Sequence, residues 1–109
     1  MKRLGMVIGI APERVAEYRR LHAAVWPAVL ERIAASGIRN YTIYLREPEN
    51  LLFASWEYDG SELEGDRAAN AADPQTQRWW PFADPCQRPL ASRAPGEDWS
   101  AMEEVLHVD

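Results

Sequence analysis

Hydrophobic and polar positions change their period along the first third of the chain, and each change predicts a boundary between elements. Residues 3–10 are apolar and partly β-branched, which favours a strand that ends at Ala11-Pro12. Apolar side chains then recur on one helical face, mostly at steps of four residues: Val15, Leu21, Val25, Val29 and Ile33. This spacing predicts an amphipathic helix that begins at Pro12 and continues to about Ser36, with Gly37 as its C-terminal cap.

The next segment alternates with a period of two, which indicates strands. Residues 38–46 form one such run, and residues 51–58 form a second after the turn sequence Glu47-Pro48-Glu49-Asn50. The two runs predict an antiparallel hairpin. In the second run one face carries Leu52, Ala54, Trp56 and Tyr58, and the other carries Leu51, Phe53, Ser55 and Glu57. Because both faces are largely apolar, we expect both to be covered, although the pattern does not say which one points inward.

The second half of the chain predicts two short helices and a closing strand. Residues 61–72 are rich in Ala and Glu, residues 74–82 contain three large rings, residues 83–96 form a proline-rich loop, and residues 102–108 resemble a strand. The order is β-α-β-β-α-β, so we expect one α+β domain over residues 1–109 with the ferredoxin-like fold. Its antiparallel sheet would carry helices on one face. A second copy would cover the other face, giving a homodimer of the dimeric α/β barrel type.

Composition restricts the classes of function. Hydrophobic residues make up 47% and charged residues 27%, which is typical of a globular protein. The net charge is −5 and the 12 Lys and Arg residues are scattered, which argues against a nucleic-acid partner. One Cys and 2 His form no known zinc spacing, and there is no glycine-rich phosphate loop. No apolar run reaches membrane-spanning length, so we expect a cytoplasmic protein without a membrane partner. Because the sequence has neither a zinc spacing nor a phosphate loop, we also expect no cofactor.

The candidate chemistry lies on the first helix. Tyr18, His22 and Trp26 follow one another at i, i+4 and i+8, which places a phenol, an imidazole and an indole in one row beside the apolar stripe. A histidine at such a margin is either a hydrogen-bonded core residue or a group that meets a ligand, and spacing alone leaves both open. Pro27 lies inside the helical pattern and predicts a kink there, caused by a bend around a neighbour or by an opening pocket.

Four blocks of the sequence resemble the L-rhamnose mutarotase family, whose members interconvert sugar anomers. The blocks, in chain order, are Tyr18-Arg19-Arg20-Leu21-His22 with Val25-Trp26-Pro27, then Asn40-Tyr41-Thr42-Ile43-Tyr44-Leu45, then Asn50-Leu51-Leu52-Phe53-Ala54, and Gln77-Arg78-Trp79-Trp80. The resemblance runs from near residue 3 to the end of the chain. Between Gly60 and Gln75 the usual tryptophan-containing helix is replaced by an Ala- and Glu-rich sequence.

This resemblance implies an isomerase that needs no cofactor and acts on L-rhamnose or a related 6-deoxy monosaccharide. In the family the corresponding histidine is the proton donor, which implies this role for His22. Tyr18, Tyr41, Trp79 and Trp80 fall on the sugar-binding positions. Adjacent helical residues point in different directions, so one of the two indoles can instead belong to the core.

Two functions other than that of a mutarotase stay open at this point. The same topology serves dimeric α/β barrel binding proteins and monooxygenase-like proteins, in which His22 would bind haem iron or an aromatic substrate. A plain dimerisation module is the third alternative.

Overall fold

The computed structural model describes residues 1–109, and it keeps the predicted sequence of strand, helical segment, hairpin, helical segment and final strand, with a further short strand before the last one. The strands are β1 (Lys2–Ile10), β2 (Ile38–Arg46), β3 (Leu51–Tyr58), β4 (Gln87–Arg88) and β5 (Ser100–Met102). The α-helices are α1 (Val15–His22), α2 (Pro27–Ala35), α3 (Leu63–Ala72) and α4 (Pro74–Ala83), and short 3-10 turns form η1 (Pro12–Arg14) and η2 (Asp84–Cys86). The predicted α+β, ferredoxin-like fold is confirmed.

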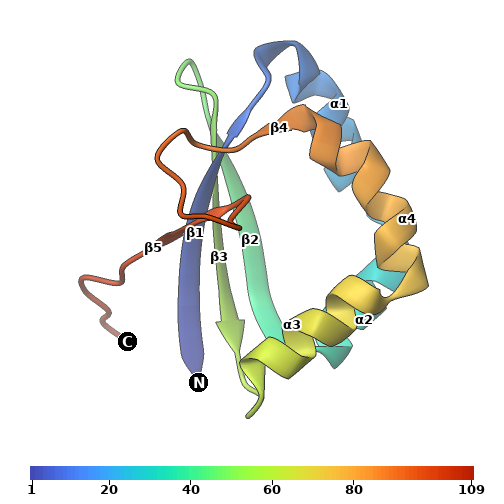
Figure 1. Cartoon of the computed structure of the whole chain (residues 1–109), viewed down its shortest axis with the longest axis vertical. Coiled ribbons are helices and arrows are strands. Elements are labelled where there is room, and N and C mark those ends of the chain that lie inside the picture. The colour runs from blue at the N-terminus through green and yellow to red at the C-terminus, as the bar shows by residue number, and fades with distance from the viewer.

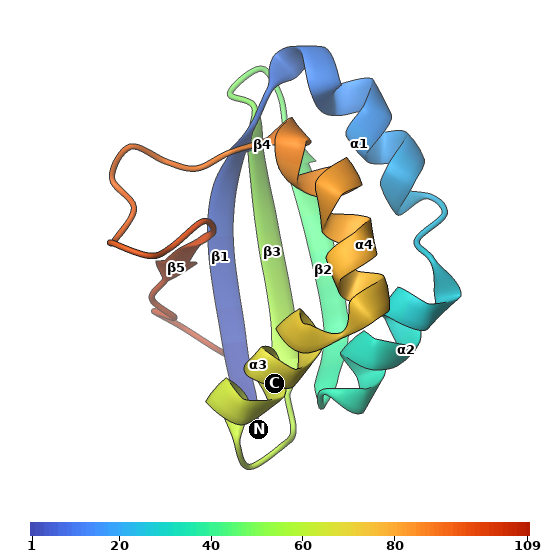
Figure 2. The same cartoon turned by 45° about the vertical axis from the view of Figure 1, so that its right-hand side comes forward.

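The strands form one antiparallel sheet in the order β2-β3-β1-β4, and β5 also pairs with β1. The predicted hairpin of β2 and β3 is present, with Leu45 opposite Leu52. All four α-helices lie on one side of the curled sheet (Figures 1 and 2). The loop that joins β4 to β5 and the C-terminal tail lie beyond β1, at the edge of the sheet (Figures 1 and 2).

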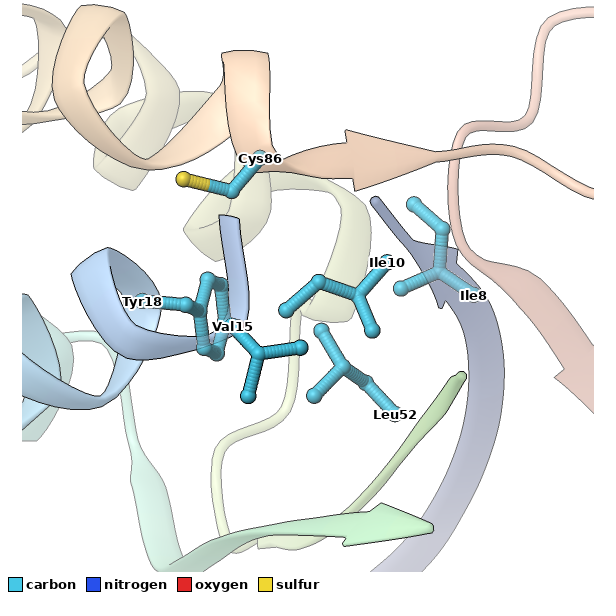
Figure 3. Close-up of a cluster of buried hydrophobic side chains, with 6 residues drawn as sticks. All are labelled: Ile8, Ile10, Val15, Tyr18, Leu52 and Cys86. Atoms are coloured by element: carbon cyan, nitrogen blue, oxygen red, sulfur yellow. The ribbon is translucent and has the colours of Figure 1, made fainter. Parts of the chain in front are cut away.

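The hydrophobic core lies between the sheet and the helices. Leu52, Ala54, Trp56 and Tyr58 of β3 are buried, so this face of the hairpin is the inner one. The larger core cluster joins strands, α1 and η2 (Figure 3), and its members are Ile8, Ile10, Val15, Tyr18, Leu52 and Cys86. Full burial of a large apolar side chain contributes about 1.5–3 kcal/mol. This cluster therefore ties α1, and with it the candidate row of side chains, to the sheet.

The prediction of one continuous helix from Pro12 to about Ser36 is wrong, because the chain leaves the helical path at residues 23–26. Pro27 has no N–H to donate, and its ring disfavours the helical conformation of the residue before it. Trp26 accordingly has a ψ of 133°, and Pro27 starts α2 instead of kinking a longer helix. Gly37, with a φ of 81°, follows the end of α2 as predicted. No helix of the chain is long and apolar enough to span a bilayer.

The predicted closing strand over residues 102–108 is also wrong. Met102 is the last paired residue and lies opposite Gly5 of β1. Residues 103–108 form no strand, and because β1 begins at Lys2, residues 106–108 would lie beyond its end in any case. Within the predicted loop over residues 83–96, the chain instead completes α4 and forms η2 and β4.

Candidate active site

A cavity of about 1070 Å³ opens between the helices and the inner face of the sheet. Its walls come from α1, α2, α3, α4, β1 and β2, and from the loop between β4 and β5. All five residues predicted for catalysis and binding line this one cavity: Tyr18, His22, Tyr41, Trp79 and Trp80. The tertiary structure thus gathers side chains from α1, β2 and α4 around a single space.

His22 is the last residue of α1 and is half-buried. Its Nδ1 lies 2.9 Å from the backbone carbonyl oxygen of Tyr18. A carbonyl oxygen only accepts hydrogen bonds, so Nδ1 carries the proton of the neutral imidazole. The proton-accepting nitrogen of that neutral ring is therefore Nε2, which makes no other hydrogen bond within the chain.

The surroundings of His22 shift its protonation towards the neutral form. Burial lowers the pKa of His22 below its ordinary value of 6.5, and the hydrogen bond to the Tyr18 carbonyl opposes this only in part. The ring stacks on Tyr18 with centroids 4.0 Å apart and meets the edge of Trp79 at 5.7 Å. Aromatic contacts on two sides hold the imidazole in one orientation.

Tyr18 belongs to the core as well as to the cavity wall. Its side chain is buried, and its hydroxyl has no hydrogen-bond partner in the protein, although Gln87 lies nearby. Burial raises the pKa of this phenol far above its usual value, so it keeps its proton. A buried hydroxyl without a partner is costly, and a ligand hydroxyl would satisfy it.

Tyr41 reaches the cavity because β2 contains a bulge. The pairing with β3 shifts between Arg39 and Thr42, and Asn40 has a φ of 51°. The extra residue lets Tyr41 share the inner face, where it stacks on Trp56 with an interplanar angle of 9°. Its side chain is 43% exposed, yet desolvation raises its pKa, which is the combination expected on the wall of a concave cavity.

The two adjacent tryptophans have different environments, as their positions on one helix require. Trp79 is only 6% exposed and forms a second core cluster with Val29 and Ala83, so it presents only part of its ring to the cavity. Trp80 is 38% exposed. Trp26 does not continue the row of Tyr18 and His22, because the chain breaks before it, and it packs edge-on against Trp79 at 5.4 Å instead.

Sequence reasoning missed several side chains of the cavity. Asp84, Gln87, Asp98 and Trp99 all line it, and all lie in or next to the segment predicted as a loop. No pattern in the sequence pointed to these residues, because only the tertiary structure brings them to the cavity. No group of three or more His, Cys, Asp and Glu side chains is placed to hold a metal ion.

Fold and cavity together define a ferredoxin-like α+β domain with a histidine and several aromatic side chains around one pocket. A family model described as L-rhamnose mutarotase matches residues 3–108. An L-rhamnose mutarotase of Escherichia coli O1:K1 / APEC is 32% identical over 108 residues, covering 99% of each chain. The chain therefore belongs to the L-rhamnose mutarotase family, and the predicted enzyme class, an isomerase, is confirmed.

Solved structures agree on the fold. The crystal structure of an L-rhamnose mutarotase from Formosa agariphila matches with a TM-score of 0.78 at 21% identity, over 100% of both chains. Tetracenomycin F2 cyclase of Streptomyces glaucescens, a type-II polyketide cyclase, matches with a TM-score of 0.70 at 15% identity, also over 100% of both chains. At such identities these likenesses concern the fold alone, and one fold serves different chemistries.

Proposed function

We propose that the protein interconverts the α and β anomers of L-rhamnose, or of a related 6-deoxy sugar, by general acid–base catalysis at His22. Membership of the family supports the reaction. The single structural observation that carries the proposal is the position of His22, with one nitrogen bonded to a carbonyl and its ring bordering the cavity.

Anomer exchange requires two proton transfers in each direction. When the pyranose opens, the ring oxygen gains a proton and the anomeric hydroxyl loses one, which leaves an open-chain aldehyde. Rotation about the bond between the first two carbons and reclosure then give the other anomer. In its charged form, His22 donates the proton on Nε2 to the ring oxygen; during closure the neutral ring takes it back.

The remaining four predicted residues hold the sugar. The Tyr41 and Tyr18 hydroxyls supply hydrogen bonds that orient the sugar hydroxyls, and their raised pKa values keep them protonated as donors. Trp80 and the accessible part of Trp79 offer indole surface to the C–H face of the ring. These contacts position the anomeric carbon without taking part in the proton transfer.

The choice of sugar depends more on hydroxyls than on the methyl group. An apolar contact with one methyl is worth about 1–3 kcal/mol, whereas an unpaired hydrogen-bonding group in the site rejects a wrong epimer more strongly. We therefore expect L-mannose, which has the hydroxyl pattern of L-rhamnose, to be exchanged, and epimers to be exchanged more slowly.

Saturation-difference NMR at the anomeric protons tests this proposal directly. Saturation of one anomer of L-rhamnose should transfer to the other when the protein is present and should not do so with buffer alone. Strong transfer for L-fucose without transfer for L-rhamnose would show that the named sugar is wrong. Absence of transfer for every reducing sugar tried would refute the proposed reaction.

We also propose a homodimer formed by the outer face of the sheet. Val7, Phe53 and Tyr44 lie side by side on three neighbouring strands. Phe53 alternates with the buried Leu52 and Ala54, so the three residues lie on the outer face of the sheet. Tyr44 is 62% exposed. Contiguous apolar surface of this kind usually marks an interface, and a second copy of the same sheet is complementary to it.

A further inference from the structure

His22 supplies one of the two proton-transfer groups that the proposed reaction needs, and the cavity must supply the other. Apart from His22, the side chains on its wall that can exchange protons near neutral pH are the carboxyls of Asp84, Glu97 and Asp98. The phenols of Tyr18 and Tyr41 are poor candidates, because burial raises both pKa values and keeps the groups protonated. The choice therefore lies among three carboxyls.

Glu97 already has a structural task. One of its carboxylate oxygens accepts a hydrogen bond from the backbone N–H of Ala94 at 3.0 Å, and the other accepts one from Ala101 at 3.4 Å. Both oxygens thus hold the loop that leads into β5. A carboxylate that is engaged in this way is not free to exchange a proton with a substrate.

Asp84 stands next to the residues around His22. It is the first residue of η2, directly after α4, and η2 packs against α1. The charge of Asp84 contributes to the raised pKa of Tyr18, whose ring stacks on His22 at 4.0 Å. Asp84 makes no hydrogen bond or salt bridge with another side chain. Its position therefore leaves the carboxylate available to a ligand beside Tyr18.

We propose that Asp84 is the second acid–base group, and that it takes the anomeric hydroxyl proton while His22 protonates the ring oxygen. This inference rests on the proposed mutarotase function. Ring opening transfers one proton from the sugar to Asp84 and one from His22 to the sugar. Closure returns both protons, so the enzyme ends each cycle unchanged.

The environment of Asp84 fits a stronger base than an ordinary aspartate. Burial raises the pKa of its carboxyl above the ordinary value, and the charge of Asp98 raises it further. The other charged or titratable groups near it are Glu97 on the same loop as Asp98, Tyr18 on α1, and Cys86 on η2 itself. Arg88 forms no salt bridge with Asp84; its guanidinium donates to the carbonyls of Pro85 and Gln87, each at 2.8 Å.

The pair predicts a bell-shaped pH dependence of kcat/KM. Activity needs a deprotonated Asp84 and a protonated His22, so it falls on the acid side as Asp84 takes up a proton. It falls on the alkaline side as His22 loses its proton, with an apparent pKa below 6.5. The fall on the acid side, the acid limb of the profile, follows the titration of Asp84. It lies at a higher pH than for an ordinary aspartate, because the pKa of Asp84 is raised.

Asp84→Asn and Asp98→Asn are the matched variants that test this assignment, with anomer exchange of L-rhamnose measured by NMR from pH 4 to 8. Asp84→Asn should lower kcat by about 10²- to 10⁴-fold, because it removes one positioned proton transfer, and should abolish the acid limb. Asp98→Asn should keep kcat and move the acid limb to lower pH, since it removes the charge that raises the pKa of Asp84.

The Asp84 side chain makes no hydrogen bond or salt bridge within the protein, so we expect Asp84→Asn to fold. If it does not fold, the shift of the acid limb in Asp98→Asn tests the role of Asp84 by itself. An acid limb that is unchanged in both variants, or full activity in Asp84→Asn, would overturn the role of Asp84. Loss of exchange in His22→Ala with full activity in Asp84→Asn would refute this inference and leave the proposed function intact. Full activity in both would refute both.

Discussion

His22 and Tyr18 stand one helical turn apart, and this relation was predictable because residues four apart share one face of a helix. What the sequence could not give is the direction of the two nitrogens. The contact of Nδ1 with the Tyr18 carbonyl depends on the ring's rotamer, and Trp79 of α4 packs against that ring from outside the helix. The choice between a core histidine and a reactive one therefore required the tertiary structure.

Tyr18→Phe tests the role of the Tyr18 hydroxyl. The hydroxyl is buried and has no partner in the protein, so its removal should not lower the free energy of unfolding and should raise it by about 1–3 kcal/mol, the cost of an unpaired buried group. Sugar affinity should fall by about 0.5–1.5 kcal/mol, which corresponds to one lost hydrogen bond. Denaturant unfolding and NMR titration with L-rhamnose measure the two effects, and Tyr44→Phe on the outer face is the control. A large stability loss with unchanged affinity would mean that Tyr18 is only a core residue.

The path of the first helical segment shows what hydrophobic period alone misses at the element scale. The apolar repeat continues through residues 23–26, so it predicts one helix, but the rigid ring of Pro27 breaks that helix into two. A similar limit applies to β2, where the bulge at Asn40 changes which residue faces inward. Strict alternation still placed Tyr41 with Ile43, because regular pairing resumes at Thr42 between them.

Pro27→Ala distinguishes a helix start from a kink. At the first position of α2 the proline ring matches the helical φ, so its loss should destabilise the protein by about 0.4–1 kcal/mol through the unfolded chain. A proline in the middle of a continuous helix would behave in the opposite way, and its replacement would stabilise the protein by up to roughly 3 kcal/mol. Thermal and denaturant unfolding of the two proteins decide between these results.

At the scale of the whole molecule, most of the order of the helices and strands could be predicted, because hydrophobic periodicity and turn sequences are local features of the chain. The partners of the last strands were not, since the pairing of β4 and β5 with β1 joins residues at opposite ends of the chain. For the same reason the cavity residues Asp84 and Trp99 were invisible until the fold brought them beside α1. The predicted cytoplasmic location stays a prediction.

The homodimer is tested by Phe53→Glu. This residue lies at the centre of the outer apolar face, so a carboxylate there should prevent two sheets from packing together. The parent protein at micromolar concentration should have twice the 12.4 kDa mass of one chain by light scattering, and the variant should have the mass of one. Phe82→Glu, on the helical side, is the control and should stay dimeric. A parent protein with the mass of a single chain would contradict the proposal.

The central claim is that His22 carries the proton transfer of anomer exchange, and His22→Ala measured by saturation-difference NMR on L-rhamnose tests it most directly. The other histidine provides a matched control, because His107 lies in the C-terminal tail and contacts Asp109 at 2.7 Å, away from the cavity. Exchange should be lost in His22→Ala and unchanged in His107→Ala, with both variants folded by circular dichroism. Exchange close to that of the parent protein in a folded His22→Ala would contradict the account.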